Sequence, residues 1–198
     1  MEEKRPLAVD NKEEANGADK DRFLLVKAKD GDKNAYGKLV LLYQRRLVRQ
    51  IFMMMGQLDM AEDIVQEAFV KGYLALDSFE INRPFYPWIT KIARNLALNR
   101  IKRENKMSAF SELDEVEIEI PDSSNNPQNN LIEKENDRRL AQAVLALPIA
   151  FRTVFVLRTV EKMSYEDIAK KLKISIGTVN SRLSRAREKL VEMLKDLL

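Results

Sequence analysis

The chain has 198 residues and a formal net charge of +3 at pH 7, and it contains 0 Cys and 0 His. These absences exclude disulfides, thiolate nucleophiles, thiolate metal sites and imidazole catalysis. Carboxylate chemistry survives them, but they count against an enzyme, and we expect no metal, no cofactor and no catalytic activity. With only 6 Gly and 6 Pro beside abundant Leu, Ala, Lys, Glu and Arg, the composition favours an all-α protein.

The N-terminal residues are polar. Residues 1–21 show no helical period, which is typical of a disordered tail. No apolar run follows the charged start, and none approaches the roughly 18 residues of a membrane span. We therefore expect neither a signal peptide nor a membrane span, and a cytoplasmic protein.

Residues 22–103 carry helical patterns that predict an N-terminal domain. A short helix should end at Asp30-Gly31, and Asp32 is a suitable N-cap for a helix over 34–55. That helix is expected to end at Gly56-Gln57. Its predicted inward positions are Ala35, Leu39, Leu42 and Tyr43.

The next predicted helix, over 60–76, has an unusual outer face. Its inner face is apolar and consists of Ala61, Ile64, Val65, Ala68 and Gly72. Its outer face mixes polar, acidic and apolar residues, namely Asp63, Gln66, Glu67, Val70 and Leu74. Such a mixture suits docking of a basic, partly apolar partner, but another helix of the same domain could also cover it. The residues alone leave these alternatives open.

A loop at 77–87 and a basic helix over 88–103 follow. The loop places three aromatic residues beside Asn82 and Arg83, a combination that suits an unstacked base. Core packing of the rings is the alternative, and we favour it for Phe79. From Lys91 to Lys106, six basic residues and one acidic residue give +5, which indicates a nucleic-acid surface.

The composition changes at residues 104–132, which lack a helical period. Between Ser111 and Asp122 there are six acids and no base, so we predict a flexible acidic linker. An inert tether is the default role for such a segment. Helical patterns resume over 133–145 and 149–160 and continue to the end, so residues 133–198 are predicted to form a second small domain.

Residues 163–194 predict a helix-turn-helix. Ser164 and Ser175 are N-caps of two helices that are separated at Lys173-Ile174. On the second helix, one buried stripe is formed by Val179, Leu183, Ala186 and Leu190. The strip away from it consists of Thr178, Ser181, Arg182 and Arg185. Hydroxyl and guanidinium groups on an exposed helix can read base edges and phosphates, although a merely solvated basic face is a less favoured alternative.

Three motifs in this order resemble the bacterial sigma-70 family, in its extracytoplasmic-function (ECF) group. AEDIVQEAF (61–69) is similar to the helix that docks on the polymerase clamp, and WITKIARNLALNRIKR (88–103) to the helix that contacts the −10 element. Residues 147–190 are similar to the −35-binding domain. The resemblance implies an RNA polymerase sigma factor that directs promoter-specific initiation and assists strand opening.

The resemblance also implies roles for individual residues. It assigns docking on the β′ clamp to Asp63, Gln66, Glu67 and Val70. It assigns −10 contacts and melting, with a flipped base held at 82–86, to Asn82, Arg83, Phe85, Tyr86, Asn95, Asn99, Arg100 and Arg103. It assigns −35 contacts to Thr178, Asn180, Ser181, Arg182, Arg185 and Arg187. Asn99 stands where the family commonly has Asp, so the DNA contacts at this position can differ from those of the family. The 82–84 loop varies within the family, so the resemblance does not imply which base it prefers.

The implied partners are core RNA polymerase, through its β′ clamp and β flap, and promoter DNA. Family members are often bound by an anti-sigma factor, so the resemblance implies such a partner. No residue of the sequence indicates it directly. The runner-up is a stand-alone helix-turn-helix regulator, for which we find no dimer seam and no role for residues 61–69. A nucleic-acid enzyme that uses carboxylates and Mg²⁺ has little support, because the acids lie in the linker or on the docking helix, with no clustered pair beside a basic groove.

Overall fold

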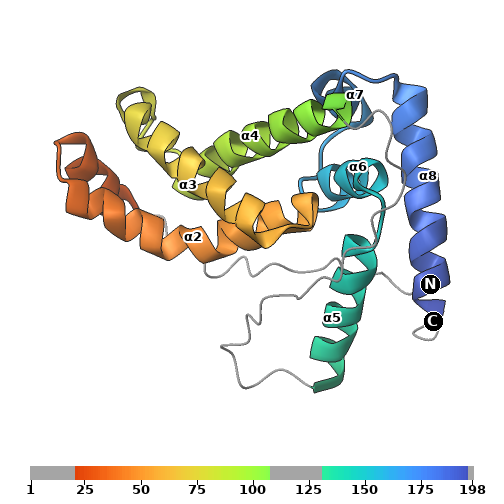
Figure 1. Cartoon of the computed structure of the whole chain (residues 1–198). Helices are drawn as coiled ribbons and strands as arrows, with labels where there is room; N and C mark the ends of the chain where they lie inside the picture. Colours follow the sequence, from red (N-terminus) through yellow and green to blue (C-terminus); the bar gives the residue numbers. More distant parts are fainter. Residues whose placement is uncertain (1–20, 108–130, 196–198) are drawn as a thin grey trace, which may run out of the picture.

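The computed structural model describes residues 21–107 and 131–195, and the side chains of 104–107 and 131–135 are not described. Within these ranges the chain forms helices and turns and no strand, which confirms the all-α class. Figure 1 shows two groups of helices, one from each half of the chain. The predicted tail (1–21) lies outside the described residues except for its last position, and most of the predicted linker (104–132) also lies outside them.

Four helices build the N-terminal domain. A helix over 21–29 is followed by α2 (Lys33–Met55), α3 (Leu58–Leu74) and α4 (Phe85–Met107), with a 3₁₀ turn, η1 (Leu76–Ser78), after α3. The three long helices pack against one another, and their shared core is apolar. Its fully buried members include Leu39, Leu47, Ile51, Met54, Phe85 and Ile89.

The helix ends follow the local chemistry of the sequence. Asp32 is the N-cap of α2, since its Oδ1 accepts hydrogen bonds from the backbone N–H groups of Asn34 (2.9 Å) and Ala35 (3.2 Å). Gly56 ends α2 with a φ of 75°, and its N–H donates to the carbonyl of Phe52. Glycine tolerates this left-handed conformation, so the chain can turn directly into α3.

A glycine also sets how closely the three long helices approach. A Cβ at Gly72 of α3 would lie 2.7 Å from Ile89 Cδ1 and 2.8 Å from the Tyr36 hydroxyl. That hydroxyl donates a 2.7 Å hydrogen bond to the carbonyl of Phe69. The contact therefore joins α2, α3 and α4 at one point and brings the basic helix α4 against the core.

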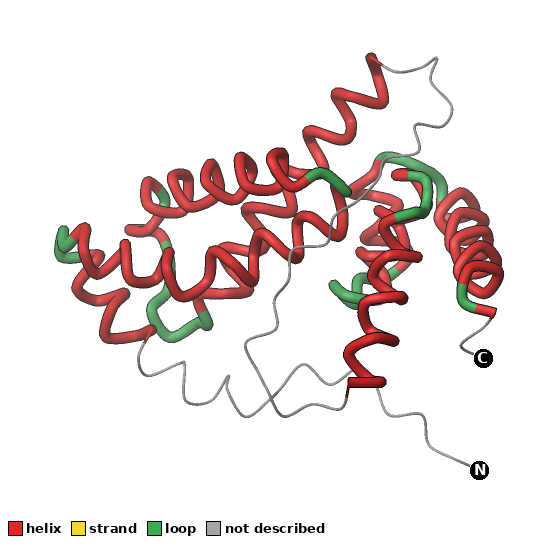
Figure 2. The backbone as a smooth tube through the Cα atoms, turned by 60° about the horizontal axis from the view of Figure 1, so that its bottom comes forward, coloured by secondary structure: helices red, strands yellow, loops and turns green. Residues whose placement is uncertain are grey.

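The C-terminal domain consists of α5 (Leu131–Leu145), α6 (Ile149–Thr159), α7 (Tyr165–Leu172) and α8 (Ile176–Met193). As the sequence predicts, α5 and α6 pack with the two helices of the helix-turn-helix. Figure 2 shows that the described connections are short, which fixes each helix relative to the next. None of the helices in the described ranges has the length and apolar character needed to cross a membrane.

The structure corrects two local expectations. Leu42, predicted to face inward, is 58% exposed, because the helical repeat places Leu39 and Tyr43 toward the core instead. α4 begins at Phe85 rather than at residue 88 and extends to Met107. Pro87 does not delay the helix, because a proline in the first turn lacks only an N–H that has no helical partner there.

The two domains also touch each other, although the sequence predicts only a tether between them. α2 contacts both α5 and α6. In Figure 1 the end of α2 and the end of α4 both point toward the C-terminal domain.

Candidate nucleic-acid interface

The helix-turn-helix is built by two serine caps and one left-handed residue. Ser164 Oγ accepts from the N–H of Asp167 at 3.0 Å, and Ser175 Oγ accepts from the N–H of Thr178 at 3.0 Å. Lys173 ends α7 with a φ of 57°. These local features confirm the predicted motif and fix the direction in which α8 leaves the turn.

α8 has one buried face and one polar face. The buried stripe is the predicted one: Val179, Leu183, Ala186 and Leu190. On the polar side, Asn180, Ser181, Arg185 and Arg187 are exposed, while Thr178 and Arg182 are half-buried. Thr178 Oγ1 lies 2.8 Å from Ser175 Oγ, and Ser181 Oγ donates to the Thr178 carbonyl at 3.1 Å.

α4 presents a second polar and basic strip. Lys91, Asn95, Asn99, Arg100 and Arg103 are exposed, and Lys102 is half-buried. The opposite side of the helix is apolar, and Ile89, Ala93 and Ala97 are fully buried. The strip thus stands on a helix that the core holds rigidly, as a readout surface requires.

The loop before α4 divides into an exposed and a buried part. Asn82 and Arg83 are exposed, and Arg83 Nε pairs with Glu80 Oε2 at 2.9 Å. Tyr86 is half-buried, donates to Gln50 Oε1 at 2.7 Å and stacks against the Arg46 guanidinium at 4.2 Å. The exposed part of the loop is therefore accessible to a partner, while Tyr86 anchors its other end.

Phe85 is a correction to the sequence-based assignment. The resemblance places it among the −10 contacts, but its side chain is 0% exposed. It packs edge-on against Phe79 and Tyr36, with centroids 6.1 and 6.2 Å apart, and lies 5.7 Å from Trp88. Phe85 is therefore an anchor of the core beneath the loop. Phe79 is buried as well, in agreement with the favoured alternative.

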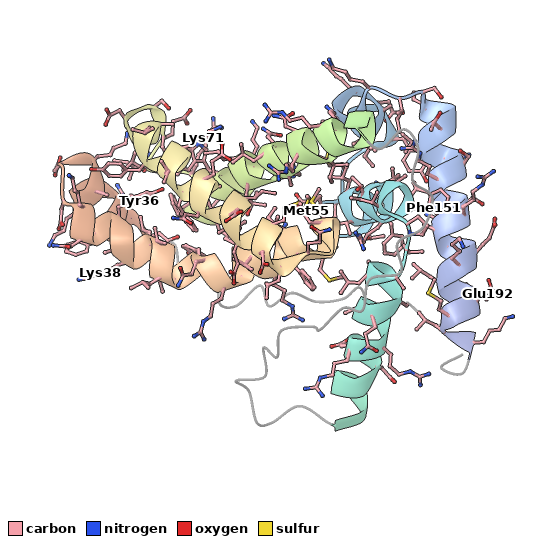
Figure 3. The ribbon with its side chains drawn as sticks, in the orientation of Figure 1. Tyr36, Lys38, Met55, Lys71, Phe151 and Glu192 are labelled. Carbon is pink, nitrogen blue, oxygen red and sulfur yellow. The ribbon has the colours of Figure 1, made fainter. Side chains whose placement is uncertain are left out.

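The outer face of α3 is uncovered within the described part of the chain. Asp63, Gln66 and Glu67 are exposed, Val70 is 55% exposed and Leu74 is 76% exposed. Glu67 pairs with the solvent-exposed Lys71, at 2.8 Å on the same helix. Packing by another described helix therefore does not explain this face. Lys71 is labelled on α3 in Figure 3.

Sequence reasoning missed a groove beside this face. Between α2 and α3 lies a groove of about 1550 Å³, to which Gln66 and Val70 contribute. Its apolar lining includes Val65 and Phe69, and its basic lining comes from α2 as Arg45, Arg46 and Arg49. The adjacent Arg45 and Arg46 in the sequence indicate a basic surface on this helix. Periodicity does not show which neighbouring helix that surface faces, so the groove cannot be predicted.

The described residues offer little for metal chemistry. Within 21–107 and 131–195, no three acidic side chains gather into a group that could hold a metal ion. The chemistry on the surface is instead that of guanidinium, ammonium and amide groups, which bind phosphates and base edges. The fold and these surfaces together define an all-α, two-domain DNA-binding protein with a helix-turn-helix in its second domain.

Comparison with known proteins identifies the family. The model of sigma-70 region 2 matches residues 39–107, and the model of sigma-70 region 4 matches residues 137–190. The ECF RNA polymerase sigma factor SigW of Bacillus subtilis is 34% identical over 180 residues, which cover 87% of this chain and 96% of that protein. The ECF RNA polymerase sigma-E factor of Escherichia coli is 33% identical over 184 residues, which cover 90% of this chain and 96% of that protein.

A solved structure agrees with these relatives. The sigma factor RpoE from Bartonella quintana, determined in complex with the anti-sigma factor NepR, has a TM-score of 0.51 and 26% identity. The match covers 81% of this chain and 96% of that one. The chain belongs to the sigma-70 family, in its ECF group, and is a promoter-directing sigma factor.

Proposed function

We propose that α8 reads the −35 element through Thr178, Asn180, Ser181, Arg182, Arg185 and Arg187. The observation that carries this is the exposed polar face of α8 above a fully buried stripe, in a capped helix-turn-helix. Phosphate contacts fix the register of such a helix, and base-edge contacts by arginine add sequence preference.

The −10 element is assigned to the strip on α4 and to the loop before it. Asn95, Asn99, Arg100 and Arg103 lie on the strip, and Asn82, Arg83 and Tyr86 are proposed to hold a displaced base. Phe85 is omitted from this set because it is buried. Binding of unstacked bases offsets the free energy of opening the duplex, so the same residues assist melting.

Docking on core RNA polymerase is assigned to the outer face of α3, through Asp63, Gln66, Glu67 and Val70. Carboxylates beside exposed aliphatic groups fit a partner that is basic and partly apolar, as proposed for the β′ clamp. The apolar part of 147–160 and the terminal LVEMLKDLL (190–198) are the proposed contacts with the β flap.

The proposed organisation keeps residues 22–103 and 133–198 as the two functional domains, joined by 104–132. The chain selects the start site in the cytoplasm, and polymerase performs the phosphoryl transfer. Because the Bartonella quintana relative was determined with an anti-sigma factor, we include such a partner in the proposal.

A matched pair of substitutions on α8 tests the −35 assignment. Arg185 and Lys189 are both exposed cations on this helix, but only Arg185 belongs to the proposed reading set. Arg185→Ala should reduce run-off transcription by about tenfold or more and relax −35 base preference, since a bidentate base contact is worth roughly 1–3 kcal/mol. Lys189→Ala should reduce run-off transcription only slightly, and to the same extent from all promoters. Equal effects of the two substitutions would overturn the assignment.

Charge reversal on α3 tests the docking assignment. Asp63→Lys with Glu67→Lys should lower affinity for core polymerase and leave the melting temperature of the free protein unchanged. Asp77→Lys, on the exposed turn η1, is the control for a charge change in the same domain. Unaltered polymerase affinity in the double variant would show that this face is not the dock.

A further inference from the structure

The groove between α2 and α3 combines positive charge with apolar side chains. Four cations and one acid of the described residues line it, which leaves a local charge of +3: Lys33, Arg45, Arg46, Arg49 and Glu62. All five residues are exposed. The apolar lining includes Val48 of α2, which is half-buried, and Val70 of α3, which is 55% exposed. A ligand that complements this groove is therefore acidic and partly apolar.

Two of the arginines are available to such a ligand. Arg45 and Arg49 are four residues apart on α2, so their side chains lie on one side of the helix. Within 21–103 and 136–195, no carboxylate forms an ion pair with either of them. Arg46 differs, because its guanidinium lies 4.2 Å from the centre of the Tyr86 ring. Arg45 and Arg49 therefore give the groove a row of positive charge that no ion pair of the described side chains neutralises.

The linker of the same chain contains a segment of complementary chemistry. Residues 110–122 (FSELDEVEIEIPD), which lie outside the described ranges, carry six acids and no base. Acidic and aliphatic residues alternate over 115–120 (EVEIEI). In an extended chain, this spacing would place the three glutamates on one side and the three aliphatic residues on the other. The segment can thus present an apolar edge to the groove and carboxylates to the arginines beside it.

The N-terminal tail is a poorer fit for the groove. Residues 1–20 carry six acids and four bases, so their net charge is only −2. Their longest apolar run is the three residues 7–9, and acidic and aliphatic residues do not alternate in them. The acidic segment of the linker therefore matches the groove better than the tail does.

The length and the attachment of the linker also fit. α4 ends at Met107, and α5 begins at Leu131. α5 packs against α2 and supplies Ala141 to the lining of the groove, so the chain leads from the linker back to the groove itself. At about 3.3 Å per residue, an extended chain over 110–120 spans about 36 Å. The 23 residues of α2 span about 35 Å at a rise of about 1.5 Å per residue, so the segment is long enough to follow the groove.

We propose that residues 110–122 bind along the groove between α2 and α3 of their own chain when polymerase is absent. The aliphatic side chains of the segment contact Val48 and Val70, and its carboxylates pair with Arg45 and Arg49. Because the segment is tethered to the domain, its effective concentration at the groove is far above that of a separate peptide. Val70 also belongs to the proposed polymerase dock, so the segment competes with polymerase. This last consequence rests on the proposed role of α3.

A free peptide of residues 110–122, labelled with fluorescein, tests whether the groove is occupied by the chain's own segment. Fluorescence anisotropy measures its affinity for full-length chains. The linker variant, Glu117→Gln with Glu119→Gln, should bind the peptide about 3- to 10-fold more tightly than the parent chain, because its own segment leaves the groove in a larger fraction of molecules. The tail variant, Glu13→Gln with Glu14→Gln, makes the same charge change in residues 1–20 and should match the parent chain.

Substitutions in the groove test where the peptide binds. In the background of the linker variant, Arg45→Gln with Arg49→Gln should weaken peptide binding about tenfold or more, because the peptide loses its charged partners. Arg22→Gln with Lys38→Gln removes the same charge at exposed positions that do not line the groove, and should weaken binding by less than about twofold. All four residues are exposed, so the melting temperatures of both variants should stay close to that of the linker variant.

Affinity for core polymerase tests the competition. The linker variant should bind core polymerase about 3- to 10-fold more tightly than the tail variant. Equal affinities of the two variants would overturn the competition while leaving the groove as the binding site of the segment. If Asp63→Lys with Glu67→Lys leaves polymerase affinity unaltered, the dock assignment fails and the competition fails with it, and the peptide measurements alone decide whether the segment occupies the groove.

The peptide measurements can overturn the proposal in two ways. Equal peptide affinity of the parent chain and the linker variant would show that the segment does not occupy the groove of its own chain, which would then be a site for an acidic segment of another protein. Absence of binding to the linker variant, or equal weakening by the groove substitutions and their control, would show that the groove does not bind the segment.

Discussion

Arg152 shows how much a single side chain contributes to this molecule. Its guanidinium donates to three carbonyls, one in its own domain and two at the end of α2. Burial lowers the pKa of Arg152 to about 10, so the group remains charged at neutral pH. A buried charge is tolerated when it is hydrogen-bonded, and here each of the three guanidinium nitrogens donates to a carbonyl.

Arg152→Met should therefore destabilise the protein. It leaves three carbonyls without their donor, and we expect a loss of about 2–4 kcal/mol in the free energy of unfolding, measured with urea. Arg83→Ala is the control, because its ion pair with Glu80 is 70% and 67% exposed. That substitution should change stability by less than about 1 kcal/mol. Similar losses in both variants would contradict the role of Arg152.

At this scale the sequence is informative about some residues and silent about others. Val70 and Leu74 can be recognised as unusual because carboxylates flank them on one helical face. Arg152 cannot, because an arginine inside an apolar helix is usually expected to reach solvent. The assignment of Phe85 to the DNA contacts is wrong, since the sequence does not show whether an aromatic ring beside a loop packs inward or outward.

At the scale of elements, close packing of α2, α3 and α4 depends on Gly72. Gly72→Ala should destabilise the protein by about 1–3 kcal/mol, because its Cβ would overlap Ile89 and Tyr36. A Cβ added at Gly37 of α2 would have no neighbour within 4 Å. Gly37→Ala should thus stabilise α2 by about 0.5–1 kcal/mol, since glycine is unfavourable within a helix. Thermal unfolding measures both effects. If both substitutions shifted the melting temperature in the same direction, the close packing at Gly72 would be contradicted.

The N-cap in the first turn of α8 gives a second prediction about the stability of a secondary-structure element. Ser175→Ala removes the N-cap bond to Thr178 and should reduce stability by about 1 kcal/mol, with weaker binding to −35 duplexes. Ser184→Ala, at an exposed position that bonds Glu188, is the control. Chemical unfolding and fluorescence anisotropy measure the two effects. An unchanged stability of Ser175→Ala would show that the cap does not set the start of the helix.

The secondary-structure elements are the part of this structure that the sequence predicts best. Asp32, Ser164 and Ser175 can be identified as caps because a short polar side chain precedes each helical pattern. The buried stripe of α8 follows from spacing alone. The start of α4 is predicted too late, because the prolines at 84 and 87 are typical of a loop although a helix accepts proline in its first turn.

For the whole molecule, the two domains and their order can be predicted, but the interface between them cannot. Arg152 and Met54 are 98 residues apart in the chain, and no local pattern connects them. In the sequence, Glu161, Arg94 and Gln50 each resemble ordinary surface residues of separate segments. Only the folded arrangement shows that the strip on α4, for which we propose DNA contacts, also meets the second domain.

Promoter-directed initiation is tested most directly by adding the chain to bacterial core RNA polymerase, followed by run-off transcription from a library of genomic fragments. We expect stable co-purification and new start sites that share two sequence elements at a fixed spacing. Asp63→Lys with Glu67→Lys should abolish both results, while Asp77→Lys should preserve them. Tight binding to DNA by the chain alone, without polymerase association or new start sites, would contradict the assignment.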